Sequence, residues 1–145
     1  MQAAQACRRT GPILRRTLDA HASILIQAHM NGLKKLPAVF YRTSAGREPV
    51  REWLKGMQPA DRKIVGDDIR DCEFAWPVGL PLCRAITGRG GLWEIRSNLT
   101  GGRIARVLFC VEQGRMVLLH GFIKKTRKKP AREIDLAESR MKGGG

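Results

Sequence analysis

The densest positive charge in the chain is concentrated in one short segment. HGFIKKTRKKPAREI, residues 120–134, leaves an apolar stretch and continues into a run of cationic side chains. Its six lysines and arginines are Lys124, Lys125, Arg127, Lys128, Lys129 and Arg132. Clustered cations attract polyanions, and a lysine crowded by other cations gives up its proton more readily than an isolated one. The segment is therefore suited to phosphate binding and to proton exchange.

A second set of candidate residues depends on the pairing of three apolar segments. If three-residue loops that end in glycine connect these segments, Arg96 lies opposite Arg106, and Arg106 lies opposite His120. The result is a row of two guanidiniums and one imidazole across one face of a sheet, with Glu94 on the same face. If Gln113-Gly114 instead forms a two-residue turn, His120 moves to the opposite face.

Arg106 is the least ordinary residue of this set, because it interrupts an otherwise apolar strand. It serves either as a phosphate ligand or as the structural ion-pair partner of Glu94. His120 is either a member of the same site or a hydrogen-bonded core histidine. Both pairs of alternatives stay open at the level of sequence.

Cleavage of RNA is the most demanding chemistry that these residue types would support. One group must remove the proton of the 2′-hydroxyl, another must protonate the departing 5′-oxygen, and cations must stabilise the phosphorane. Arginines supply the last function, Lys124 and Lys125 are candidates for proton exchange, and Glu94 or His120 would act as the base. We therefore expect the basic segment to form one wall of a phosphate-binding cleft.

The overall composition agrees with a polyanionic partner. The 145 residues are 43% hydrophobic, enough for one domain with a buried core, and carry a formal net charge of +14. Residues 48–73 hold five lysines and arginines against seven acids, whereas residues 84–132 hold twelve against two. A uniformly solvated surface would not separate its charges in this way. The sequence therefore favours a dedicated anion-binding face.

The sequence gives no signal for a metal site, a cofactor or a membrane segment. The four cysteines are irregularly spaced, and no histidine lies at ligand spacing from them. They are Cys7, Cys72, Cys83 and Cys110. We therefore expect buried, reduced thiols in a cytoplasmic protein. No apolar run approaches the roughly 18 residues that a membrane-spanning helix needs.

Apolar periodicity and turn residues predict the elements that must position the candidate residues. The pattern predicts a strand at 38–42, helices at 48–57 and 59–74, strands at 92–99, 103–111 and 115–123, and a helix at 130–142. Residues 1–36 are expected to form a helical extension, and residues 143–145 a disordered tail. Residues 1–29 are either an addition from a start codon upstream of Met30 or a helix that packs on the domain or on a partner. The predicted fold class is α+β, with one sheet face covered.

The C-terminal half of the chain resembles a known family. LWEIRSNLTGGRIARVLFCVEQGRMVLLHGFIKKTRKKPAREIDLAESR combines a glycine-separated meander, the run H-G-F-I-K-K-T-x-K-x-P and a helix that begins x-x-E-I-x-x-A. These features are similar to the phage-derived, HigB-like branch of the RelE/ParE toxin superfamily. FYRTSAGREPVREWL also fits the first strand and helix of that family, so the resemblance covers residues 37–142 as one toxin domain.

The resemblance implies a fold, an activity and partners. The fold would be of the RelE-like, microbial-RNase type, with an antiparallel sheet packed by two N-terminal helices and a C-terminal helix. The protein would be a type II toxin that cuts translated mRNA on the ribosome, as an endoribonuclease without a metal or cofactor. Its partners would be the ribosome, mRNA and a helix-turn-helix, HigA-like antitoxin. Two alternatives remain, a non-catalytic, phage-derived nucleic-acid-binding regulator and a ParE-like toxin that poisons gyrase.

Matched position by position, the resemblance implies roles for residues already singled out. The basic residue of the second strand of RelE-like toxins falls on Arg96, the arginine of the next strand on Arg106, and the later cations within Lys124–Lys128. The catalytic candidates are Arg96, Arg106, Lys124, Lys125, Glu94 and His120. The candidates for RNA or ribosome binding are Arg103, Arg127, Lys128, Lys129 and Arg132. The late tyrosine of RelE-like toxins has no counterpart, since Tyr41 is the only tyrosine, so the general acid and base stay unassigned.

Overall fold

The computed structural model describes residues 33–125 and 127–143. The helical extension predicted over residues 1–36 lies almost entirely outside the described residues, and so does most of the predicted tail. Within the described part, the chain from Lys35 onward forms one compact unit. No helix of the described residues is both long and apolar enough to cross a membrane.

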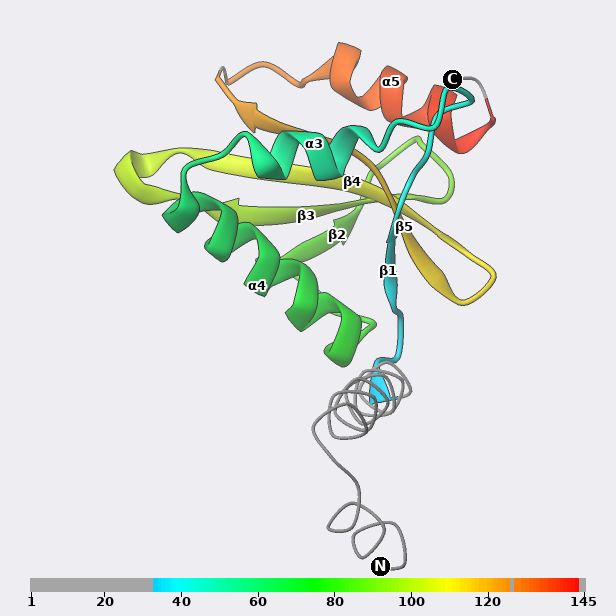
Figure 1. Ribbon diagram of the computed structural model, residues 1–145, viewed down its shortest axis with the longest axis horizontal. Helices are drawn as coiled ribbons and strands as arrows, with labels where there is room; N and C mark the ends of the chain where they lie inside the picture. The colour runs from blue at the N-terminus through cyan, green and yellow to red at the C-terminus, as the bar shows by residue number, and fades with distance from the viewer. Residues whose placement is uncertain (1–32, 126, 144–145) are drawn as a thin grey trace, which may run out of the picture. The chain divides into compact units, whose positions relative to one another are not determined.

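A five-stranded sheet with the strand order β1-β5-β4-β3-β2 forms the centre of this unit (Figure 1). Its strands are β1 (Ala38–Phe40), β2 (Cys83–Ala85), β3 (Leu92–Asn98), β4 (Ile104–Glu112) and β5 (Arg115–Lys124). The helices are α3 (Pro49–Lys55), α4 (Pro59–Ala75) and α5 (Ala131–Met141), and a 3-10 turn spans Thr100–Gly102. The predicted α+β class is confirmed. The sheet is mixed rather than antiparallel, because β1 runs parallel to β5, and the short strand β2 was not predicted.

Helices cover both faces of the sheet. Successive residues of a strand point to opposite faces, and buried apolar residues lie on both of them. On β4, Val107 and Phe109 belong to a core cluster formed with α3 and α4, whereas Leu108 and Cys110 belong to a second cluster formed with α5. Figure 1 shows α4 and α5 on opposite sides of the sheet. The expectation of one covered face is therefore wrong, since α5 packs its own apolar side on the second face.

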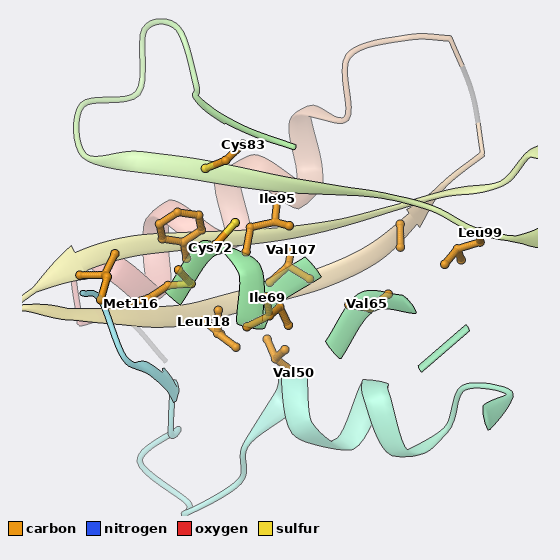
Figure 2. Packing of buried hydrophobic residues seen from close by; sticks show 13 residues of the cluster. Val50, Val65, Ile69, Cys72, Cys83, Ile95, Leu99, Val107, Met116 and Leu118 are labelled. Carbon is orange, nitrogen blue, oxygen red and sulfur yellow. The ribbon is translucent and has the colours of Figure 1, made fainter. Parts of the chain in front are cut away.

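The larger core cluster lies between the sheet and the helices α3 and α4. Val65, Ile69 and Cys72 follow one another at helical spacing on α4 and are all buried, as their periodicity predicts. Figure 2 shows Ile69 and Cys72 beside Ile95 and Val107 of the sheet. The described cysteines, Cys72, Cys83 and Cys110, are buried free thiols. The long β3 and β4 strands are thus held rigidly by packing, which matters because they carry the candidate site.

The hairpin between β3 and β4 has the predicted register. Arg96 lies opposite Arg106, as expected from a three-residue loop. The N–H of Leu99 donates to the carbonyl of Arg103 at 2.8 Å and closes the hairpin. In the loop, Gly101 and Gly102 both have φ of 74°, a conformation that glycine adopts without strain.

The hairpin between β4 and β5 does not have the predicted three-residue loop. Glu112 pairs with Arg115 across the two-residue turn Gln113-Gly114, whose φ values are 51° and 70°. Two successive positive φ values are typical of the tight turn that matches the twist of a hairpin. By itself, this turn would move His120 to the opposite face of the sheet.

A β-bulge in the same hairpin reverses that effect. Phe109 pairs with Leu118, whereas Leu108, the residue before it on β4, pairs with His120. Leu119 is therefore an extra residue on β5. His120 therefore returns to the face that carries Arg106. The predicted pairing of Arg106 with His120 is nevertheless wrong, because Arg106 lies opposite Phe122.

Candidate phosphate-binding site

A buried ion pair lies in the middle of the sheet. Glu94 on β3 and Arg106 on β4 are only 2% and 5% exposed. Nη1 of Arg106 donates to Oε2 of Glu94 at 3.2 Å, and Oε1 of Glu94 accepts from Nε of Arg84 on β2. One carboxylate therefore holds two guanidiniums from the strands on either side of it.

The surroundings of Arg106 are unfavourable for a cation. Burial lowers the pKa of the Arg106 guanidinium, Glu94 partly offsets this effect, and the positive charges of Arg96 and Arg84 lower the pKa further. An arginine stays protonated even so. Among the described residues, Nε of Arg106 has no hydrogen-bond acceptor, although it is buried. A buried N–H without an acceptor costs about 1–3 kcal/mol, so the position of Arg106 is costly, and an anion bound nearby would offset its charge.

A pocket of about 340 Å³ is lined by this ion pair. Its walls come from β2, β3, β4, the end of β5 and the segment that leads into α5. Its charged lining residues are Arg84, Glu94, Arg106, Lys124, Arg127 and Lys129. Five cations thus surround one carboxylate that is already paired. We therefore interpret the pocket as a site for an oxyanion such as a phosphate group.

Several other cations of the described residues pair with neighbouring acids, in contrast to those of the basic segment. Arg42 pairs with Glu48 at 3.1 Å, and Arg47 pairs with Glu52 at 2.7 Å. None of the ion pairs found among the described residues involves Arg96 or any cation of the basic segment. These cations are Lys124, Lys125, Arg127, Lys128, Lys129 and Arg132. Their charge is therefore available to an external anion.

The candidate residues divide between the pocket and its surroundings. Arg106, Glu94, Lys124, Arg127 and Lys129 line the pocket. Arg96 lies on the same face of the sheet, opposite Arg106, but does not line the pocket. The carboxylate of Glu94 is buried between two guanidiniums. This environment suits a counter-ion rather than a base that accepts a proton from a substrate hydroxyl.

His120 lies outside the pocket and is fully hydrogen-bonded. Its Nε2 bonds to the carboxylate of Glu133 at the start of α5, and its Nδ1 lies 3.4 Å from Nη1 of Arg140. A guanidinium only donates, so we assign Nδ1 as the acceptor and place the proton on Nε2, which donates it to Glu133. Arg140 also donates to the carbonyl of Leu119 at 2.8 Å. His120 therefore fastens α5 to the sheet.

Arg103 holds the β3–β4 hairpin against α4. Its Nη2 lies 2.7 Å from Oδ2 of Asp61, and its Nε donates to the carbonyl of Thr100 at 3.0 Å. Asp61 is only 3% exposed, so this arginine neutralises a buried carboxylate. The assignment of Arg103 to RNA binding stays a prediction, but the structure gives it an internal role.

Three residues that complete this arrangement, Arg84, Glu133 and Arg140, were not among the predicted site residues. Arg84 was missed because β2 has only three residues, too few for a periodic pattern. Glu133 lies in the same quoted segment as His120, which could have signalled an acid–histidine pair. The contact between His120 and Glu133 depends on how α5 packs against the sheet, and so do the contacts of Arg140.

These features define a class: an α+β protein in which a mixed sheet carries a buried arginine and an adjoining cationic pocket. The chain belongs to the phage-derived Gp49-like family, whose model, described as Phage derived protein Gp49-like (DUF891), matches residues 52–142. The match covers more than half of the chain, and the family is RelE-like and related to toxins. No curated protein matches the chain. The expected resemblance is thereby confirmed for the family, whereas the HigB-like branch stays a prediction.

Replacing Glu94 with glutamine should destabilise the fold strongly. Glutamine keeps the shape but removes the negative charge, so Arg106 would stay buried beside Arg84 without its counter-ion. Loss of one partner of a buried ion pair costs about 3–5 kcal/mol, which denaturant unfolding would measure. Glu112→Gln removes an exposed carboxylate at the end of β4 and is the control, with an expected change below about 0.5 kcal/mol. Equal stability of the two variants would show that Arg106 does not need this carboxylate.

Replacing Arg103 with glutamine should separate its structural role from RNA binding. The buried carboxylate of Asp61 would lose its ion pair but keep the hydroxyl of Thr100, which lies 3.3 Å away. We expect a loss of about 1–3 kcal/mol in the free energy of unfolding, with unchanged affinity for single-stranded RNA. If RNA affinity falls while stability does not, Arg103 is an RNA ligand.

Proposed function

We propose that this protein is the toxin of a type II toxin–antitoxin system, a HigB-like toxin that cuts translated mRNA on the ribosome. The observation that carries the proposal is the pocket in which Arg106 converges with three cations of the basic segment that form no ion pair with a described residue. A site built from arginine and lysine side chains suits the phosphate groups of a nucleic acid. Membership of a phage-derived, toxin-related family supports a toxin-like role.

In the proposed reaction, the RNA itself supplies the nucleophile. The 2′-oxygen attacks the adjacent phosphorus, the bond to the 5′-oxygen breaks, and the products carry a 2′,3′-cyclic phosphate and a 5′-hydroxyl. Arg106 and Arg84 stabilise the charge that develops on the phosphorane. Lys124 and Lys129 line the same pocket and are the proposed groups that take up the 2′ proton and deliver one to the 5′-oxygen. The positive charge comes from side chains, so this mechanism calls for no metal ion.

Two consequences concern partners and place. An RNA-cutting toxin must be neutralised until it is needed, so we propose a helix-turn-helix, HigA-like antitoxin as its partner. We also propose that the toxin acts in the cytoplasm, where its ribosomal substrate is located. A small helix-turn-helix gene beside the coding sequence whose co-expression restores growth would support this pairing.

Arg106→Gln should abolish cleavage while leaving a folded protein, because Arg84 still neutralises Glu94. Loss of a donor to a developing oxyanion costs on the order of 10²–10³ in rate. The assay maps in-frame mRNA ends after translation with purified ribosomes, and circular dichroism verifies the fold. Lys63→Gln alters an exposed lysine on α4 and is the control.

The same assay, run beside a DNA-cleavage assay with gyrase and plasmid DNA, decides between the proposal and its alternatives. A folded Arg106→Gln variant with full activity would show that this pocket is not the active site. If the wild-type protein leaves both mRNA and DNA intact, it is a binding protein. If it breaks DNA instead, it acts as a gyrase poison.

The affinity for RNA should depend steeply on salt, with the basic segment responsible. Each phosphate contact contributes roughly 0.7–0.9 to the slope of log K against log salt concentration. The double variant Lys124→Gln/Lys125→Gln should therefore flatten the slope by about 1.4–1.8 relative to the wild type. Fluorescence anisotropy with a labelled oligonucleotide measures this slope. An unchanged slope would mean that these lysines do not contact phosphates.

A further inference from the structure

A second hollow lies next to the phosphate-binding pocket. It has a volume of about 790 Å³ and is lined by Trp53 of α3, by the end of β5 from His120 onward and by the start of α5. We call it the Trp53 hollow. Lys124, Lys129 and Pro130 line both this hollow and the phosphate-binding pocket. A nucleic acid with one phosphate in the phosphate-binding pocket would therefore have its neighbouring nucleotide beside the Trp53 hollow.

Aromatic rings line the hollow, and one glycine makes room for the ring of Trp53. A Cβ atom on Gly121 would lie 2.3 Å from Cε3 of Trp53, so the indole ring rests directly on the backbone of β5. The rings of His120 and Phe122 stack nearly parallel, with centroids 5.7 Å apart and an interplanar angle of 18°. Flat π-systems of this kind are the usual surfaces on which proteins stack unpaired nucleobases.

The hollow also contains a hydrogen-bond acceptor. The Glu133 side chain lines it and is 38% exposed, although it already accepts the proton of His120 Nε2. A carboxylate has about four acceptor positions, so Glu133 has capacity for further donors. Carboxylates in nucleic-acid sites accept from the amino group of cytosine, whereas uracil presents a carbonyl oxygen at the same position. Lys125 and Arg132, which also line the hollow, are cations for the backbone of the same nucleotide.

We propose that the Trp53 hollow binds the base of one unpaired nucleotide and that Glu133 selects a base with an amino group, as cytosine has. The neighbouring phosphate occupies the pocket of Arg106, so the inference rests on the proposed RNA substrate and deepens it. Glu133 is thus a specificity-determining residue, positioned by His120, while the cations supply affinity without regard to sequence.

The test compares two oligonucleotides, the hexanucleotides C6 and U6, which carry the same number of phosphates. We expect the full-length wild-type protein to bind C6 about tenfold more tightly than U6 in fluorescence anisotropy. Glu133→Gln keeps the size of the side chain and can still accept from His120, but its amide also donates to a uracil carbonyl. The preference should therefore fall to about onefold. The control, Glu112→Gln, makes the same change of charge away from the hollow and should keep the preference.

A second variant tests the stacking surface. Gly121→Ala would displace the ring of Trp53 and should lower the affinity for both hexanucleotides by about tenfold. Circular dichroism shows whether the variant is still folded. Equal binding of C6 and U6 by the wild-type protein would overturn the inference and leave the proposed function standing, because cleavage requires only the phosphate site. A cytosine preference without mRNA cleavage would support the hollow and overturn the proposed cleavage. If neither oligonucleotide binds at low salt, both proposals fail.

Discussion

The burial of one positive charge in the middle of the sheet constrains the rest of the structure. Arg106 occupies a strand position that packing would otherwise give to an apolar side chain, and it is tolerable there because Glu94 lies on the adjacent strand with its carboxylate beside the guanidinium. Glu94 in turn needs a second cation, which Arg84 brings from the edge strand β2. The three-residue edge strand β2 thus contributes to the network, since its pairing with β3 places that guanidinium beside Glu94. The proposed phosphate-binding pocket is the open side of this buried network.

The second constraint is the attachment of α5. The two-residue turn and the bulge at Leu119 act together, because each alone would leave His120 on the face away from α5. With both present, His120 meets Glu133, and Arg140 reaches the carbonyl of Leu119. These contacts fix both ends of the helix on the sheet. The basic segment joins β5 to α5, so five of its six cations, all except Lys128, line the phosphate-binding pocket, the Trp53 hollow or both.

The charges of the molecule are sorted by whether they have a partner. On and around α3, exposed arginines such as Arg42 and Arg47 are neutralised by acids close in sequence. Arg103 belongs to this paired group as well, although its partner, Asp61, is distant in sequence. The cations from Lys124 to Arg132 form no ion pair with a described residue, and Lys124, Arg127 and Lys129 among them line the same pocket. Sequence counts detect the asymmetry, but only the contacts show which cations are available.

The sequence by itself determined the α+β class, the larger elements and the pairing of Arg96 with Arg106. These follow from apolar periodicity and from glycines in a three-residue loop, which are local properties. Tertiary structure decided the parallel strand β1, the strand β2 with Arg84, the position of His120 and the role of Arg103. A bulge changes the register by one residue, and a three-residue strand has no periodicity, so neither leaves a clear local signal. The contacts of Glu133, Asp61 and Trp53 join elements far apart in the chain and arise only when whole faces pack together.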